Sequence, residues 1–374
     1  MKSSPMGRRA FLMTPLFAAS AVTRVALAAE KKPNIVLVIA RGWRGVSTPF
    51  SGDPDIQAPN LEKFGEDSAV FPRAYCCDPR PAPARSAILT GLYPHSNGVT
   101  DDNAGMRVEE VTIGAALRTA GYQSGTQLDF LDAAGAGPFF LNLSLEAAWD
   151  AKPVDAAKLH LRENVPAASQ ATARKALAGR YGAYRAMDEQ FGRVLHALDR
   201  LNLADNTIVV FTSDCGDQLG SHGLTGDGAF YEEAVRVPLA IRFPRVIAHG
   251  FKSDVLASHA DIMPTLLGFC GEPSPDGIQG NDLSPLLVSG QGDRPELVFL
   301  EGRIGQKDEW RALVLGLDKA VVDAQGAMTH LFNLADDPYE MTNLAHDPAL
   351  QLKRDQLLAQ LRAERQRLLD FSRR

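Results

Sequence analysis

Four side chains in one short stretch of the sequence have the types needed to bind a metal or to move protons. Asp214, Cys215, His222 and Asp227 together offer oxygen, sulfur and nitrogen ligands. They follow an apolar, β-branched run that predicts a buried strand, and three of them are close neighbours on its end and the loop beyond. That closeness is weak support for a formed metal site. His222, like His259 further along the chain, is expected to be structural unless a partner for it is found.

A second stretch indicates the start of a helix. Tyr75 and Cys76 precede the sequence Pro-Ala-Pro-Ala-Arg at residues 81–85. Pro83 suits the first turn of a helix, because the N–H that proline lacks is not needed there. Arg85 follows, and an arginine near a helix start often only pairs with a local acid.

Buried strands and helices alternate along the sequence, and these elements must position the polar residues. Continuous apolar runs at residues 34–39, 138–145 and 207–212 predict central strands of a parallel sheet. Apolar residues recur every three or four positions over 184–201, which predicts an amphipathic helix before the third strand. The alternation predicts an α/β fold with a mostly parallel sheet.

The sequence pattern changes after about residue 290. Short strand-like pieces separated by polar or glycine-containing turns predict a small antiparallel sheet: 297–300, 311–315 and 319–322. Residues 349–374 predict a charged amphipathic helix that packs on the body. We therefore expect a main α/β domain at 31–290 and a small C-terminal α+β subdomain at 291–374.

Charge and cysteine content exclude some functional classes. The formal net charge of the 374 residues is -6, with acidic and basic residues mixed along the chain. No basic stripe is present that would follow a phosphate backbone, so nucleic acid is excluded as a partner. The four cysteines, at positions 76, 77, 215 and 270, are too few for a disulfide-built scaffold, and their pairing stays open.

The first 28 residues have the features of an export signal. Arg8 and Arg9 are followed by a modest apolar stretch and by the small residues around Ala28. Paired arginines are typical of twin-arginine export. A membrane span needs roughly 20 apolar residues, and this stretch is shorter. We expect cleavage near Ala28, a periplasmic or secreted mature chain, and no membrane span after cleavage.

Several sequence blocks occur in a family-like order and spacing. They are KPNIVLVIA at 32–40, APNL at 58–61, RSAILTGLYPH at 85–95, DNTIVVFTSD at 205–214, YEEAVRVPL at 231–239, DIMPTL at 261–266 and NLADDPYEMTNL at 333–344. Together they resemble the sulfatase family of the alkaline-phosphatase superfamily. The resemblance implies an alkaline-phosphatase-like α/β sandwich, with helices on both sides of a central, mostly parallel sheet. A small antiparallel sheet and a terminal helix complete that fold.

The resemblance also implies a chemistry for which this chain lacks key residues. In the family, a hydrated aldehyde made from a cysteine attacks sulfur, while carboxylates hold a divalent cation, usually calcium. By the resemblance, Pro81 stands at the position of that nucleophile, and a proline ring cannot form an aldehyde hydrate. Arg41 and Gly42 stand at the positions of two metal-binding aspartates.

Other motif positions depart from the family pattern as well. Asp129 and Asp227 replace lysines, Leu131 and Trp149 replace histidines, and Cys215 replaces an asparagine or histidine. Among the motif positions compared, only Arg85 and Asp214 keep the family's residue type. We therefore expect no calcium or other cofactor in this chain and no catalysis by the family's route.

The exchanged charges predict an internal cluster of ion pairs. An unpaired buried charge costs several kcal/mol, so we expect Arg41 to fill the metal position and to pair with Asp214. Arg85 is then expected to pair with Asp129 or Asp227. The aspartates at 129 and 227 are expected to face the old anion site and to repel a sulfate monoester. Without metal, Asp214 is expected to accept hydrogen bonds from backbone amides or from Arg41.

Two functions follow from these observations. The first is a non-catalytic sulfatase relative that binds an unidentified ligand or protein partner or serves as a scaffold. The alternative is an active hydrolase of sulfuric esters, arylsulfatase-like, or a related phosphoesterase. The alternative requires a rebuilt site drawing on Asp214, Cys215, His222 and Asp227.

Overall fold

The computed structural model of the protein describes residues 31–147 and 151–371. The predicted export signal at 1–28 and the site position Trp149 lie outside the described residues. No described helix is both long enough and apolar enough to cross a membrane.

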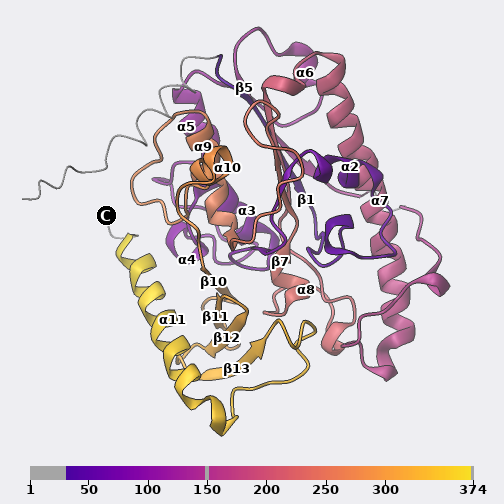
Figure 1. Ribbon diagram of the computed structural model, residues 1–374, viewed down its shortest axis with the longest axis vertical. Helices are drawn as coiled ribbons and strands as arrows, with labels where there is room; N and C mark the ends of the chain where they lie inside the picture. Colours follow the sequence, from indigo (N-terminus) through magenta and orange to yellow (C-terminus); the bar gives the residue numbers. More distant parts are fainter. Residues whose placement is uncertain (1–30, 148–150, 372–374) are drawn as a thin grey trace, which may run out of the picture.

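A six-stranded sheet forms the centre of the main body (Figure 1). The order of its strands is β2-β8-β6-β1-β5-β4. Its strands are β1 Asn34–Ala40, β2 Ala69–Val70, β4 Gln123–Gly125, β5 Phe139–Leu145, β6 Thr207–Ser213 and β8 Leu239–Arg242. β6, β1, β5 and β4 run parallel, whereas β8 is antiparallel to β6 and β2 is antiparallel to β8. The predicted α/β sheet, parallel except at one edge, is confirmed.

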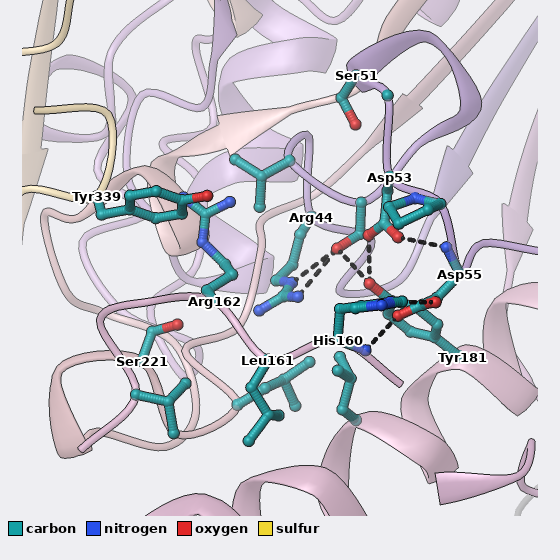
Figure 2. A pocket seen from close by; sticks show the side chains of 17 residues that line it. Arg44, Ser51, Asp53, Asp55, His160, Leu161, Arg162, Tyr181, Ser221 and Tyr339 are labelled. Carbon is teal, nitrogen blue, oxygen red and sulfur yellow. Dashed lines mark hydrogen bonds and ion pairs between the residues drawn. The ribbon is translucent and has the colours of Figure 1, made fainter. Parts of the chain in front are cut away.

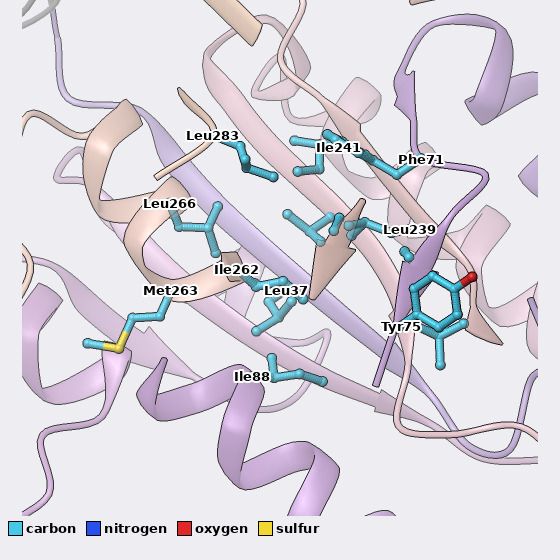
Figure 3. Packing of buried hydrophobic residues seen from close by; sticks show 14 of the residues in the cluster. Leu37, Phe71, Tyr75, Ile88, Leu239, Ile241, Ile262, Met263, Leu266 and Leu283 are labelled. Atoms are coloured by element: carbon cyan, nitrogen blue, oxygen red, sulfur yellow. The ribbon is translucent and has the colours of Figure 1, made fainter. Parts of the chain in front are cut away.

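Helices cover both faces of this sheet (Figure 1). One face carries α3 Pro81–Thr90, α5 Ile113–Thr119, α9 Ile262–Phe269 and α10 Ser284–Ser289, and the other carries α2 Pro59–Glu66 and α7 Gln170–Arg200. Figure 3 shows the first of these cores, where Leu37 of β1 packs with Ile88 of α3 and Ile262 of α9.

The sequence of β1 is apolar throughout because both of its faces are buried. Ile35, Leu37 and Ile39 belong to the core beneath α3 and α9. Val36 and Val38 point the opposite way, into the core beneath α7. Side chains alternate across a strand, so a strand between two helical layers needs apolar residues at every position.

A four-stranded antiparallel sheet and a long helix form the C-terminal part. The elements are β10 Leu297–Gly302, β11 Trp310–Leu315, β12 Asp318–Asp323, β13 Met328–Asn333 and α11 Gln351–Phe371. Leu357 and Leu361 of α11 pack on this sheet, which confirms the predicted small sheet and terminal helix. β13 was not predicted, since its apolar and polar residues follow no clear period. The proposed boundary at residue 290 falls between α10 and β10.

Short elements connect these parts. They are β3 Ala74–Tyr75, β7 Arg236–Val237 and β9 Ala257–Ser258, which form a three-stranded sheet, and the helices α4 Pro94–Asn97, α6 Phe130–Ala133 and α8 Glu232–Val235. The short sheet joins segments that are far apart in the sequence, because β3 pairs with both β7 and β9.

Candidate functional site

The carboxyl ends of three parallel strands meet at one edge of the central sheet. Ala40 of β1 is level with Leu145 of β5 and with Ser213 of β6. The residues that follow these strands therefore lie together at this edge. Ligand sites in open α/β sheets are found at such an edge, so it is the candidate site.

Asp214 lies at the centre of this edge and is fully buried. Its Oδ1 accepts hydrogen bonds from the backbone N–H groups of Gly42, over 2.8 Å, and Cys215, over 2.9 Å. Its Oδ2 accepts a hydrogen bond from Nε of Arg85 over 3.1 Å. Both carboxylate oxygens thus have protein donors.

Arg85 reaches across the edge from α3. Besides its bond to Asp214, its Nη1 donates to Oγ of Ser144 in β5 over 2.9 Å. Its Nη2 lies 3.9 Å from the carboxylate of Glu146, which follows β5. The guanidinium therefore links the ends of β6 and β5, which are the two neighbours of β1 in the sheet.

The expected pairing of Arg41 with Asp214 is wrong. Nη1 of Arg41 instead lies 3.2 Å from Oε1 of Glu146, and 57% of the Arg41 side chain is exposed. Arg85 occupies the free oxygen of Asp214, while water solvates Arg41 at little cost. The expected pairing of Arg85 with Asp129 or Asp227 is also wrong. The acidic neighbours of Arg85 are Asp214 and Glu146.

A second arginine, which the sequence motifs did not indicate, blocks the position next to Asp214. Gly42 has a φ of +63°, and a Cβ at this glycine would lie 2.9 Å from Nη1 of Arg180. Arg180, in α7, forms an ion pair of 2.6 Å with Asp217. Burial opposes the charge of Arg180, but Tyr184 and Asp217 outweigh this effect and raise its pKa. The space for a side chain at position 42 is therefore taken by a cation.

A sequence signal for Arg180 did exist. Arg180 lies three residues after Leu177 and four before Tyr184, and both of these belong to the buried face of α7. Residues at such spacings share one face of a helix. An arginine on an otherwise apolar helix face predicts a buried ion pair.

A carboxylate also occupies the start of α3. Pro81 is the first residue of that helix, and the backbone N–H of Ala82 donates to Oδ1 of Asp102 over 2.9 Å. Burial, together with the nearby charges of Asp102, Asp217 and Asp214, raises the pKa of Asp227. Asp102 and Asp227 therefore lie near the helix start where the family resemblance placed an anionic substrate, together with Arg80, which precedes Pro81 and pairs with Asp78.

Comparison with known proteins identifies the family. The family model described as Sulfatase matches residues 33–158 and 127–272, which is more than half of the chain. The chain belongs to the sulfatase family. An ulvan-active sulfatase of Formosa agariphila is 25% identical over 411 residues, covering 88% of this chain and 80% of the relative. An N-acetylgalactosamine-6-sulfatase of Mus musculus is 28% identical, covering 75% of this chain and 71% of the relative.

Solved structures of this superfamily have the same fold as this sulfatase-family chain. A phosphonate monoester hydrolase of Agrobacterium radiobacter superposes with a TM-score of 0.79 at 19% identity, over 90% of this chain and 96% of that one. A 2-O GAG sulfatase superposes with a TM-score of 0.80 at 19% identity, over 92% and 94% of the two chains. The predicted alkaline-phosphatase-like fold is confirmed.

The residues at the strand edge do not fit the divalent cation of the sulfatase family. Calcium prefers six to eight oxygen ligands, mostly from carboxylates, carbonyls and water. Here Asp214 bonds to two amides and to Arg85, Asp217 is paired with Arg180, and Glu146 neighbours two arginines. The positive charge at this edge is supplied by side chains.

Asp129 and Leu131 do not reach the sulfatase-like edge. β4 ends at Gly125, level with Leu141, which is four residues and about 13 Å short of the end of β5. The chain then turns into α6, where Leu131 is buried in the core and Asp129 is exposed. The short segment between β4 and β5 leaves these residues at a different height in the sheet.

The four residues of the alternative site, Asp214, Cys215, His222 and Asp227, do not all share one environment. Cys215 is buried, and burial together with the charge of Asp214 raises its pKa well above that of a free thiol. His222 stacks on Tyr231 at 3.7 Å, and its Nε2 accepts a hydrogen bond from Asn164 over 3.0 Å. Burial lowers the pKa of His222. The four residues therefore fall into two environments, with His222 held apart from the strand edge by its own partners.

His222 does approach two buried carboxylates. Among the described residues, it forms a group of potential metal ligands with Glu233 and Glu340, all within 4.8 Å of one another. Glu233 accepts from Arg162 over 2.6 Å, and Glu340 lies 2.8 Å from the ammonium group of Lys319. Lys319 also lies 3.1 Å from Glu232, so two cations face three buried acids. Burial, together with the charges of Glu232 and Glu233, raises the pKa of Glu340 to about 7. The group is therefore a buried ion-pair network in which Glu340 is the acid most easily protonated.

His259 and the remaining cysteines are buried within the fold. Burial lowers the pKa of His259 to about 3, so its ring is neutral at ordinary pH. All four cysteines of the chain are buried and unpaired. Burial also raises the pKa of Cys76 and Cys77, and that of Cys270 to about 12. A reactive thiolate is disfavoured at each position.

Proposed function

We propose that this sulfatase-family protein does not cleave sulfate esters by its relatives' route and acts as a binding or scaffold protein. The observation that carries the proposal is the occupation of the strand edge by protein groups beside Asp214. Gly42, at one of the positions where the resemblance places a metal-binding aspartate, has no side chain, and Nη1 of Arg180 lies 2.9 Å from where its Cβ would be. Both oxygens of Asp214, which keeps the family's residue type, already accept hydrogen bonds from protein donors. A cation at this edge would therefore lack the several oxygen ligands that calcium prefers.

The nucleophile position supports the same conclusion. Pro81 has no group that can attack sulfur. Cys76 and Cys77, the nearest thiols in the sequence, are fully buried and have raised pKa values. Asp102 accepts the amide of Ala82 at the start of α3, so an incoming sulfate would meet a carboxylate there.

Metal analysis and activity assays test this proposal. The mature protein is expected to contain only substoichiometric calcium, magnesium, manganese and zinc by elemental analysis. It is expected to show no turnover of aryl sulfate or aryl phosphate esters above the rate of heat-unfolded protein. Stoichiometric metal together with sulfate-ester turnover would falsify the proposal.

The alternative is a hydrolase with a different set of residues, and the names of the relatives favour it. The relatives include sulfatases named for activity on ulvan and on N-acetylgalactosamine-6-sulfate groups. If this alternative holds, turnover must depend on side chains at the strand edge. Loss of activity in Asp214→Asn and Asp227→Asn variants, with unchanged activity in the surface variant Asp254→Asn, would establish it.

We further propose that the chain is exported by the twin-arginine route and divides near residue 290. The motif around Arg8 and Arg9 supports the route. Replacing both arginines by lysine is expected to keep a fused reporter in the cytoplasm, whereas the unchanged signal should export it. Limited proteolysis is expected to cut first between α10 and β10, where no helix or strand spans residues 290–296.

A further inference from the structure

A cavity of about 220 Å³ lies beside the strand edge and shares no side chain with it (Figure 2). Its wall is built by the segment 44–55 after β1, the segment 160–165 before α7, the loop at 219–221, and residues of α7. Arg41, Pro81, Arg85 and Asp214 are not among its lining residues.

Arg44 is a buried cation in the wall of this cavity. Arg44 is only 3% exposed. Its Nε and Nη2 both donate to Oγ of Ser47, over 3.2 Å and 2.9 Å. Among the described residues no carboxylate lies within 4.0 Å of its guanidinium, in contrast to Arg85, Arg162 and Arg180. At hydrogen-bonding distance its guanidinium therefore meets a neutral hydroxyl and no carboxylate. Burial opposes its charge, but Tyr181, Tyr184 and the more distant Glu233 outweigh this effect and raise the pKa of Arg44.

The backbone around Arg44 holds this side chain in place. The N–H of Arg44 donates to the hydroxyl of Tyr184 over 3.1 Å. The ring of the preceding Trp43 stacks on the Tyr184 ring at 4.5 Å. Gly45 fits against the backbone of β7, where a Cβ would approach Val237 to 2.8 Å. These contacts fix the backbone from residue 43 to residue 45, and so fix the point from which the Arg44 side chain extends into the wall.

The acidic residues of the cavity wall are already engaged. Oδ2 of Asp53 accepts the hydroxyl of Tyr181, and its Oδ1 accepts the N–H of Asp55 over 3.0 Å. Asp55 in turn accepts the N–H of His160 over 2.5 Å and contacts its Nδ1 over 2.9 Å. Figure 2 shows these residues on the Tyr181 side of Arg44, with Arg162 and Tyr339 on the other side. The wall's carboxylates therefore do not neutralise Arg44.

Further groups in the wall are suited to an anion with an organic body. Ser221 is 1% exposed, and its Oγ has no hydrogen-bond partner. Arg162 places a second guanidinium in the wall, 4.7 Å from the ring centre of Tyr339. The remaining surface is partly apolar and is formed by Val46, Leu161, Val165, Leu177 and Leu219.

We propose that this cavity binds a small organic carboxylate through Arg44. Burying a cation costs free energy, and Arg44 has no carboxylate in contact to offset that cost, so a bound carboxylate would add the missing ion pair. Guanidinium and carboxylate match in geometry and charge. A single negative charge fits better than a sulfate or phosphate dianion, because Asp53 and Asp55 lie in the same wall. The apolar side chains favour a ligand with carbon atoms behind the carboxylate.

Calorimetric titration of the full mature chain tests the proposal. The probes are acetate, benzoate and gluconate, each compared with its neutral amide, and with sulfate and phosphate at equal ionic strength. At least one carboxylate is expected to bind saturably with a Kd of about 1 mM or tighter. Its amide is expected to bind at least about tenfold more weakly, which corresponds to loss of the charge contact.

Variants locate the binding. Arg44→Met is expected to weaken carboxylate binding at least about tenfold, and Ser221→Ala about three- to tenfold. Arg294→Met, which removes a surface arginine paired with Asp254, is the matched control and should bind as the unchanged protein does. If Arg44→Met does not fold, Ser221→Ala still decides the location.

Three outcomes would overturn the proposal. The first is the absence of saturable binding for every carboxylate, and the second is equal or tighter binding of sulfate or phosphate. The third is carboxylate binding of unchanged affinity in the Arg44→Met variant. If that variant does not fold, unchanged binding in Ser221→Ala takes its place. The result does not depend on whether the strand edge is catalytic, because the two sites share no lining residue and are measured by different assays.

Discussion

Nε of Arg85 lies 3.1 Å from Oδ2 of Asp214, and this carboxylate is fully buried while the guanidinium is about one quarter exposed. The bond connects α3 to the end of β6 at the edge where sulfatases are expected to work. It joins the two compared motif residues that keep the residue type implied by the family resemblance.

Removing Arg85 is expected to destabilise the fold. In Arg85→Met, the carboxylate of Asp214 keeps its two amide donors but loses its only cationic partner among the described residues. Breaking a buried pair costs about 3–5 kcal/mol, and the partial exposure of Arg85 reduces this to about 2 kcal/mol. Urea unfolding measures the loss. The matched control is Arg41→Met, expected to change the unfolding free energy by less than about 0.5 kcal/mol. Equal effects of both variants would contradict the assigned pairing.

Restoring a side chain at position 42 is expected to be costly. Gly42→Ala must adopt a φ of +63° and also displace Arg180. Gly52→Ala, at a φ of +79° with nothing within 4 Å of its Cβ, is the control for backbone strain alone. We expect a loss of about 1 kcal/mol for Gly52→Ala and about 2 kcal/mol for Gly42→Ala.

The contact with Arg180 accounts for the expected difference. In an Arg180→Ala background, the added cost of Gly42→Ala should fall to that of Gly52→Ala, as judged by urea midpoints. If the extra cost persists in that background, Arg180 does not fill the space beside Gly42.

The four thiols are expected to be unreactive in the folded protein. All are buried, and burial raises the pKa of each. An aromatic disulfide reagent at about pH 8 should label none of them until urea unfolds the chain. Ser289→Cys adds an exposed thiol as a control, which should react at once. Rapid labelling of any native cysteine would argue for an accessible thiolate and for the hydrolase alternative.

His259 is expected to make the protein sensitive to acid. Burial lowers its pKa from 6.5 to about 3, so the folded state binds fewer protons at this residue than the unfolded state does. Its contribution to stability is present above the unfolded pKa and is lost as the pH falls below about 6.5. At pH 5, which is about 1.5 units below the unfolded pKa of 6.5, the loss in the free energy of unfolding is roughly 2 kcal/mol.

The comparison of two variants isolates this effect. The unchanged protein should lose stability relative to His259→Met between about pH 7 and 5, as measured by urea unfolding at each pH. The exposed histidine variant His249→Met should follow the unchanged protein throughout. Parallel curves for the unchanged protein and His259→Met would show that His259 is not held neutral.

The sequence by itself determined the fold and the absence of an attacking group at residue 81. β1 is apolar at every position after Asn34, which indicates burial on both faces. The spacing of apolar residues every three or four positions predicts the amphipathic helix before β6. Pro81 lacks an attacking group in any conformation, so its chemistry follows from its identity. These properties are local, and local properties can be derived from neighbouring residues.

Only the tertiary structure decided which charges meet. Arg41 and Arg85 are both near Asp214 by topology, yet Arg85 from α3 takes the carboxylate and Arg41 pairs at the surface. Arg180 comes from a helix far along the chain, and Asp129 is held away because β4 ends early. An ion pair depends on the reach of each side chain and on the cost of burying it. Both are set by strand lengths and helix positions that no single motif contains.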